Sequence, residues 1–317
     1  MEGCKHVFEN VLQAQQSEKV LVVTDSPLIS VGQYFYNAAT EMKLNPVWVV
    51  YPPPGPTEKE PPGRVAKLMR ESDIFLCPTS QSLTHTRARK NASADGARGL
   101  TLPGFDRAML SSGGVLADYE KIASATASLA SRLNGSSEIR IVSDGGTDLT
   151  FDVHDGEWFA EKGMCNEPGD FGNLPGGEVS IAPVDGSGVL VVDGSINTLG
   201  KLSSPITMEI RDRKIVSMEG KRAENLENYI SQFGSEGFNV AEIGIGMNPA
   251  ARLTGKILED EKVLDTVHIG IGDNSNMGGK TVGKIVSVDM HIDGVITSNP
   301  KIFADGERVR PTDYFED

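Results

Sequence analysis

The sequence predicts an α/β protein with two domains: a Rossmann-like α/β domain over residues 1–137 and a β-rich α+β domain over residues 138–317. Up to residue 137, apolar runs of strand length alternate with segments of helical periodicity; beyond it, short runs are separated by glycine-containing turns. With 317 residues, the chain can bury one large core or two ordinary ones. The change of pattern therefore predicts a domain boundary near residue 137.

The first domain is predicted to contain βαβ units and a mostly parallel sheet, because its strands and helices alternate. Strands are predicted at 19–25, 46–53 and 74–80, and helices at 29–45, 64–73 and 117–135. The strand at 19–25 is followed by SPLISVG, which lacks the G-x-G-x-x-G pattern that lets a pyrophosphate approach a helix. No G-x-x-x-x-G-K-[ST] sequence is present either. Dinucleotide or phosphate-loop chemistry is therefore not indicated.

The second domain is predicted to be built of short strands and one helix. Strands are predicted within 138–153, 177–184, 188–196, 206–220 and 284–296, with the helix at 224–234. Further apolar runs contain the sequences AEIGIG and VHIGIG.

Charge and composition exclude several classes of partner. The formal net charge of −14 argues against nucleic acid and anionic membranes, since both require a basic face. The sequence has neither a run of 18 apolar residues nor a signal-peptide pattern. Three widely spaced cysteines without C-x-x-C are typical of reduced thiols, so we expect a cytoplasmic protein. We also expect a small-molecule substrate, since the first domain would roof the cleft.

Imidazoles and carboxylates gather near the carboxyl-terminal end of the sequence. His291 and Asp293 form an H-x-D pair whose side chains would share one face of a strand. His268 lies in another apolar strand, where a histidine is more often a core residue than a ligand. Glu242 lies in an otherwise apolar run, and a buried carboxylate there needs a metal, a cation or a raised pKa.

Glu178 follows a Gly-Gly turn and opens a further strand. Together with Glu242, His268, His291 and Asp293, it completes the kind of donor set that dinuclear hydrolytic sites use. Such donors suit one or two divalent ions of zinc, manganese, iron or cobalt. The sequence leaves a site for one ion or for two open at this point.

The strings LPGGEVSIAPVDGSGVLVVDGSI, AEIGIGMNP, DEKVLDTVHIGIGDN and HIDG closely resemble the aminopeptidase T family of metal-dependent aminopeptidases. The likeness covers residues 165–310 and extends more loosely over 82–104. It implies two divalent ions at Glu178, Glu242, His268, His291 and Asp293, and it implies a homodimer. The resemblance also places zinc, cobalt or manganese before iron. The corresponding function is hydrolysis of a small peptide-, amide- or amine-like substrate, with Glu178 or Glu242 as general base and the first domain roofing the site.

One position departs from the peptidase pattern. Those enzymes have a tyrosine shortly after the histidine that matches His268, and Ser275 stands there in this chain. Any proton donation or oxyanion stabilisation by that tyrosine must be absent or supplied elsewhere. The metal site can therefore persist without peptidase activity, and a non-catalytic binding relative is a further hypothesis.

The sequence is also similar, more distantly, to 2,5-dihydroxypyridine dioxygenases, which hold one iron with two histidines and one carboxylate. Their pattern places histidine where this chain has Glu242, and apolar residues where it has Glu178 and His268. These positions favour hydrolysis, with the Fe(II) ring-cleaving dioxygenase as the alternative. His268, His291 and Asp293 could themselves form a facial iron triad.

The basic segment SLTHTRARK follows the third predicted strand, on the rim where parallel sheets bind ligands. Arg87 or Arg89 could hold a substrate carboxylate, and His85 could act as a proton shuttle. Arg98 is a secondary candidate for substrate binding. A solvated basic loop that offsets the acidic surface is the alternative interpretation.

Overall fold

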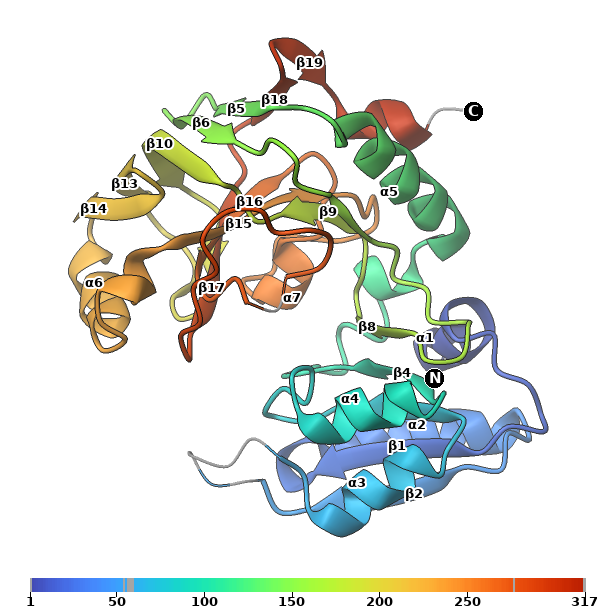
Figure 1. Cartoon of the computed structure of the whole chain (residues 1–317). Helices are drawn as coiled ribbons and strands as arrows, with labels where there is room; N and C mark the ends of the chain where they lie inside the picture. Colours follow the sequence, from blue (N-terminus) through green and yellow to red (C-terminus); the bar gives the residue numbers. More distant parts are fainter. Residues whose placement is uncertain (1, 54, 56–59, 276, 316–317) are drawn as a thin grey trace. The chain divides into compact units, whose positions relative to one another are not determined.

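A computed structural model describes residues 2–53, 55, 60–275 and 277–315, and the chain forms two compact units (Figure 1). The first unit is Met1–Glu120 with Gly163–Gly176, and the second is Lys121–Lys162 with Gly177–Asp317. The units contain a parallel sheet and antiparallel sheets, respectively, so the general α/β class is confirmed. That the first domain roofs the site stays a prediction.

The first unit is built on a five-stranded parallel sheet in the order β2-β1-β3-β4-β8, as far as the described residues extend. The strands are β1 (Val20–Asp25), β2 (Val47–Tyr51), β3 (Ile74–Cys77), β4 (Arg98–Thr101) and β8 (Phe171–Asn173). The helices are α1 (Glu2–His6), a π-helix (Val7–Val11), α2 (Ile29–Glu41), α3 (Gly63–Arg70) and α4 (Arg87–Ala94), with short 3-10 turns at Ser26–Leu28 and Gly114–Leu116.

Helices cover both faces of this sheet because successive strand residues point to opposite sides. α3 and α4 pack against the face that carries Leu21 and Val23. α2 packs on the other face, where a side chain at Gly32 would collide with Thr24. The continuous apolar runs thus predicted β1 and β3 correctly, because both faces of these strands are buried. The apolar run of β2 also predicted a strand, although this edge strand is partly exposed.

Three features of the first unit differ from the sequence prediction. The segment interpreted as a basic loop is the beginning of α4, where Thr86 accepts a hydrogen bond from the Arg89 backbone N–H. Strand β4 was not predicted either. The chain also returns to this sheet through β8, so the two units divide at 120, 162 and 176 rather than at 137.

The second unit contains two seven-stranded sheets among its described residues, in the orders β14-β13-β10-β6-β5-β18-β19 and β12-β11-β17-β16-β15-β9-β7. The first sheet contains β5 (Glu138–Val142), β6 (Asp148–Asp152), β10 (Asp185–Val192), β13 (Ile206–Arg211), β14 (Lys214–Glu219), β18 (Lys301–Ala304) and β19 (Glu307–Val309). The second contains β7 (Phe159–Glu161), β9 (Glu178–Ile181), β11 (Ser195–Ile196), β12 (Gly200–Lys201), β15 (Val240–Gly246), β16 (Val267–Gly272) and β17 (His291–Ile296).

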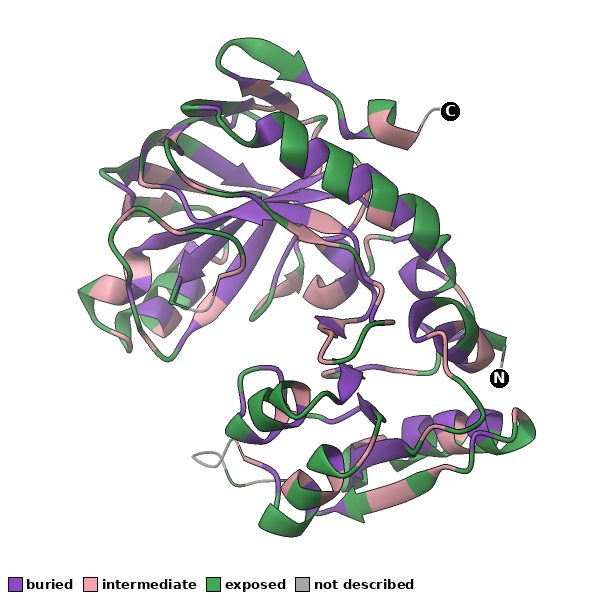
Figure 2. Cartoon of the chain, turned by 45° about the vertical axis from the view of Figure 1, so that its right-hand side comes forward, coloured by how far each residue is buried: buried purple, intermediate pink, exposed green. Residues whose placement is uncertain are grey.

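A single apolar core joins the two sheets. It combines Leu149 and Leu190 from the first sheet with Ile243, Ile269 and Ile292 from the second. Figure 2 shows these strands as buried, with exposed residues along the outer helices. The second sheet therefore presents one face to the core, and its other face is available for polar residues.

Helices close the edges of this core through their apolar sides. These are α5 (Tyr119–Leu133) and α6 (Ala223–Ser231), with the short α7 (Ile257–Asp260) and 3-10 turns at Ser235–Phe238 and Pro311–Phe315. Among the described residues, no helix is both long and apolar enough to cross a membrane.

Candidate metal centre

The candidate metal donors lie on the face of the second sheet that points away from the core. Glu242 is paired in register with Gly270 of β16, and Gly270 is paired with Asp293 of β17. His268 likewise lies opposite Gly244 of β15. Because strand side chains alternate, the intervening isoleucines and valines fill the core. The apolar runs of the sequence are thus alternating strands in which glycines and donors occupy one face.

Glycines between the donors let the larger side chains lie flat across the sheet. A Cβ atom at Gly244 would be 1.9 Å from His268 Nε2. A Cβ at Gly270 would be 2.7 Å from the Glu242 Cβ and 2.9 Å from His291 Nε2. The repeated Gly-Ile-Gly sequences therefore create the space in which the imidazoles converge on the carboxylates.

Among the described residues, the structure gathers the five predicted donors into overlapping groups. Glu178, Glu242 and His268 form one group, and Glu242, His291 and Asp293 form another, with the potential ligand atoms of each group within 4.8 Å of one another. A further group unites Glu261, His268 and Asp293. The facial triad His268, His291 and Asp293 is not one of these groups. Glu242 is common to the first two groups.

His291 is the most firmly oriented donor. Its Nδ1 donates to the Asp273 carbonyl oxygen over 2.7 Å, which directs Nε2 toward the carboxylates. Nε2 lies 3.2 Å from Glu242 Oε2 and 3.2 Å from Asp293 Oδ1. Asp293 is anchored in turn, since its backbone N–H donates to Asn197 Oδ1 over 2.5 Å.

Mutual attraction between these groups shifts their pKa values. Burial alone lowers the pKa of His291, but Asp293 and Glu242 reverse this and hold it well above 6.5. Burial raises the pKa of Asp293, but His291 lowers it to about 2 overall. For Glu242, burial is likewise outweighed by His291, so its pKa is lowered. The carboxylates thus favour positive charge at this centre, on imidazoles or on a divalent cation.

A buried lysine also lies at the centre, and the sequence analysis missed it. Lys262 is 2% exposed, and its Nζ lies 2.7 Å from Glu178 Oε2 and 2.9 Å from Glu261 Oε1. Glu161 Oε2 is 3.7 Å away. Burial raises the pKa of Glu161 to about 7 and that of Glu261 to about 8. The sequence EKV before the His268 strand was the available signal, but of the partners of Lys262 only Glu261 is adjacent in sequence, and the others come from β7 and β9.

The donor set fits a divalent metal ion. Imidazole nitrogens and carboxylate oxygens converge from β15, β16 and β17 on one side of a rigid sheet. These donors suit zinc, manganese, iron or cobalt. The carbonyl contact to His291 Nδ1 is the kind of outer contact that orients metal-bound imidazoles. Residues predicted from the sequence thus form a candidate metal centre within the second unit.

The other predicted residues lie in the first unit or in turns. His85 and Arg87 are exposed at the start of α4. Arg89 lies over the Phe171 ring at 4.0 Å, and its Nε donates to the Thr84 carbonyl. These contacts favour a structural role for Arg89 over substrate binding.

Arg98 is buried, and its guanidinium is held by Glu18 and by the Leu12 carbonyl. These contacts likewise favour a structural role for this residue. Ser275, which the resemblance to aminopeptidase T puts at the position of a tyrosine, is exposed and donates through Oγ to the Asp273 carboxylate. It therefore supports the segment that orients His291.

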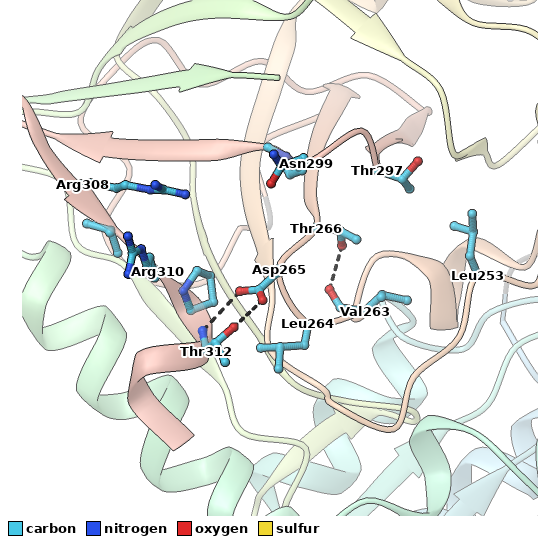
Figure 3. Close-up of a pocket in the computed structure, with 13 residues that line it drawn as sticks. Leu253, Val263, Leu264, Asp265, Thr266, Thr297, Asn299, Arg308, Arg310 and Thr312 are labelled. Atoms are coloured by element: carbon cyan, nitrogen blue, oxygen red, sulfur yellow. Dashed lines mark hydrogen bonds between the residues drawn. The ribbon is translucent and has the colours of Figure 1, made fainter. Parts of the chain in front are cut away.

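A separate hollow of about 500 Å³ lies in the same unit (Figure 3). Asp265 and Thr312 hydrogen-bond across it, and Arg308 and Arg310 lie on one side. None of the five predicted metal donors lines this hollow. It is therefore distinct from the candidate metal centre.

Comparisons with known proteins reverse the order of the two resemblances seen in the sequence. The family model for 2,5-dihydroxypyridine 5,6-dioxygenase matches residues 4–274. The structure is similar to 2,5-dihydroxypyridine dioxygenase from Pseudomonas putida KT2440, with a TM-score of 0.79, 20% identity and coverage of 97% of this chain and 94% of that chain. It is also similar to AmpT from Thermus thermophilus, with a TM-score of 0.68, 14% identity and coverage of 97% and 96%.

No curated protein sequence matches the chain significantly. The structural similarities, at these identities, establish a shared fold. The family match is independent of them and covers most of the chain, including Glu178, Glu242 and His268, although it ends before His291 and Asp293. Aminopeptidase T is thus a more distant relative, and this chain belongs to the 2,5-dihydroxypyridine 5,6-dioxygenase family.

Proposed function

We propose that this protein is a non-haem Fe(II) dioxygenase that opens the ring of a hydroxylated pyridine. The family match over residues 4–274 carries this proposal. The group of Glu242, His291 and Asp293 supports it, because it offers one imidazole and two carboxylates to a single ion. The hydrolase that the sequence analysis placed first becomes the second candidate.

In this proposal, Glu242, His291 and Asp293 hold the ion, and His291 binds it through Nε2. The Asp273 carbonyl fixes the imidazole, while the Asn197 side chain fixes the Asp293 backbone. A ferrous ion in this position supplies the redox chemistry that an organic substrate needs to react with dioxygen. Both oxygen atoms enter the product as the bond between ring carbons 5 and 6 breaks, so no external reductant is required.

Glu242 distinguishes this centre from the two-histidine, one-carboxylate set of the related dioxygenases. It adds a negative charge to the ligand set, and such a charge stabilises the more oxidised iron. We therefore expect the same class of reaction with an altered rate or an altered hydroxypyridine preference. The chain's own substrate is proposed to be a dihydroxypyridine or a close derivative.

The test is anaerobic reconstitution with Fe(II), followed by mixing with 2,5-dihydroxypyridine and dissolved oxygen. We expect one oxygen molecule consumed per substrate, with parallel loss of the aromatic absorbance. His291→Ala should abolish both signals, while Arg211→Met, at an exposed ion pair, should leave them unchanged. Absence of oxygen uptake by fully iron-loaded protein, across a panel of hydroxypyridines, contradicts the proposal.

A two-ion hydrolase remains the second candidate because Glu242 belongs to two donor groups at once. In that arrangement, Glu178 and His268 hold a second ion, and a metal-activated water attacks an amide. Zinc-, cobalt- or manganese-loaded protein would then cleave aminoacyl amides without oxygen. Hydrolysis that depends on both Glu178 and His291 would favour this candidate over the dioxygenase.

A further inference from the structure

The ammonium group of Lys262 is enclosed by carboxylates next to the metal centre. It lies 2.7 Å from Glu178 Oε2 and 2.9 Å from Glu261 Oε1, with only 3% of the side chain exposed. The Lys262 backbone is held on both sides, since its carbonyl accepts from Asn248 and its N–H donates to Glu259. The ammonium therefore has little freedom to leave the cluster.

Two of the three candidate groups of metal ligands contain His268, and Lys262 forms an ion pair with one carboxylate in each of them. One of these groups needs Glu178, whose Oε2 faces His268 Nε2 at 3.4 Å and already binds the ammonium. The other needs Glu261, which binds the same ammonium. A divalent ion in either group would share its carboxylate with a fixed positive charge, and like charges at such separations repel strongly.

In the remaining group, no ammonium is bound directly to a carboxylate. Glu242 and Asp293 form ion pairs with His291, and no lysine or arginine lies within ion-pair distance of either of them within the described residues. Lys262 acts on Asp293 only through its longer-range charge. His291 directs Nε2, an atom that can bind a metal ion, toward both carboxylates. Lys262 cannot serve as a ligand in this way, because an ammonium group only donates hydrogen bonds.

We propose that Lys262 is a built-in cation that takes the place of a second metal ion, so that the protein binds a single divalent ion at Glu242, His291 and Asp293. The inference extends the proposed function by explaining why a five-donor cluster would support one-ion chemistry. Lys262 is here a positioning residue, since it acts on the centre through Glu178 and Glu261.

The test measures how many equivalents of Co(II) bind to the metal-free protein. Binding is monitored by calorimetry and by the visible absorption of the bound ion. The wild type should bind one equivalent. Lys262→Met, which keeps the length of the side chain and removes its charge, should bind two. The control Lys284→Met removes a lysine from an exposed ion pair and should still bind one. Two equivalents in the wild type, or one in a folded Lys262→Met protein, would overturn the proposal.

A second variant decides the matter if Lys262→Met does not fold. Glu178→Gln should leave the single Co(II) equivalent in place, with its Kd changed less than threefold, because Glu178 serves the ammonium and not the ion. Loss of an equivalent, or a Kd weakened more than tenfold, would contradict the inference. Oxygen uptake is measured separately, so a protein with one ion and no oxygenase activity would refute the proposed function and not the role of Lys262.

Discussion

Two glycines of the second sheet determine how closely the metal donors approach one another. An added methyl group at Gly270 would meet both Glu242 and His291, whereas one at Gly244 would meet His268. If the ion is held by Glu242, His291 and Asp293, Gly270→Ala should weaken Fe(II) or Co(II) binding about tenfold or more, in line with other residues that orient metal ligands. Gly244→Ala should change it less than about threefold.

Gly63→Ala is the matched control for these variants, since nothing lies within 4 Å of the added methyl group. Metal affinity is measured by calorimetry on protein whose fold has been checked by circular dichroism. Greater loss in Gly244→Ala than in Gly270→Ala would place the ion at His268 instead.

Glu242 stands where the resemblance to the dihydroxypyridine dioxygenases implies a histidine. Glu242→His would produce a set of two imidazoles and one carboxylate, which typifies non-haem Fe(II) oxygenases. We expect this variant to retain one Fe(II) and to consume oxygen with a dihydroxypyridine within about tenfold of the wild-type rate. In a two-ion hydrolase the same change would remove the shared carboxylate and abolish the activity. Iron content and oxygen uptake together distinguish the two outcomes.

The histidines make metal binding depend on pH. His268 and His291 have pKa values raised above 6.5: burial lowers them, but the neighbouring carboxylates more than reverse this. An ion held by Glu242, His291 and Asp293 must displace the proton of His291, so affinity should increase with pH, by about tenfold per pH unit. The increase should continue above pH 6.5 and level off only above the raised pKa of His291.

The stability of the metal-free protein should change in the opposite direction. The two histidines have a higher pKa in the folded protein than in the unfolded chain, so their protonation stabilises the fold below pH 6.5. This stabilisation is lost as the pH rises through the raised pKa values. Calorimetric titrations of Zn(II) in buffers with different ionisation enthalpies measure the protons released. A pH-independent affinity between 6 and 8 would contradict the assignment of His291 as a ligand.

At the scale of elements, Arg213 connects the strands around the centre. Its guanidinium donates to Asn239 Oδ1 over 3.1 Å, to the Pro183 carbonyl over 2.7 Å and to the Lys284 carbonyl over 2.6 Å. Asn239 in turn donates to the carbonyl of Gly272, the residue before Asp273. This network fixes the ends of β15 and β16 and the segment that leads to β17.

Arg213→Met should reduce the free energy of unfolding by about 3 kcal/mol, because it leaves buried acceptors without donors. Arg211→Met, whose guanidinium is exposed and pairs with Glu209, should cost no more than about 0.5 kcal/mol. Urea unfolding of both proteins gives the comparison. Equal effects would show that the Arg213 network does not support the sheet.

Strands and helices could be predicted from the sequence where a local pattern of apolar residues marks them. The strands near 19–25 and 74–80 were found because continuous apolar runs reflect burial on both faces. Glu242 was predicted for a related reason, since a charged residue in an apolar run needs a partner. His291 and Asp293 were predicted from their H-x-D spacing, and the resemblance to aminopeptidase T completed the set. Lys262 was missed because its partners on β7 and β9 lie about a hundred residues away, and β8 was missed because it pairs with β4, about seventy residues before it.

At the scale of the whole molecule, metal binding should stabilise the second unit. Glu242 lies on β15 and Asp293 on β17, and these strands flank β16 in the middle of the sheet. An ion that binds both would therefore connect β15 and β17 across β16, and the other faces of these strands fill the core of that unit. At a free metal concentration of a hundred times Kd, binding to the native state alone adds about 2.7 kcal/mol.

The chain provides a fluorescent probe for each unit, since Trp48 lies in the first and Trp158 in the second. Trp48→Phe leaves Trp158 as the reporter, and Fe(II) or Zn(II) should raise the unfolding midpoint that it records. Trp158→Phe reports the first unit, which has a core of its own around Leu21 and Phe75, so a smaller shift is expected there if the units unfold separately. His291→Ala should remove the metal-dependent shift, because the ion then loses the imidazole between its two carboxylates. A Trp158 transition that does not respond to metal in the protein with all its ligands would place the binding site outside this sheet.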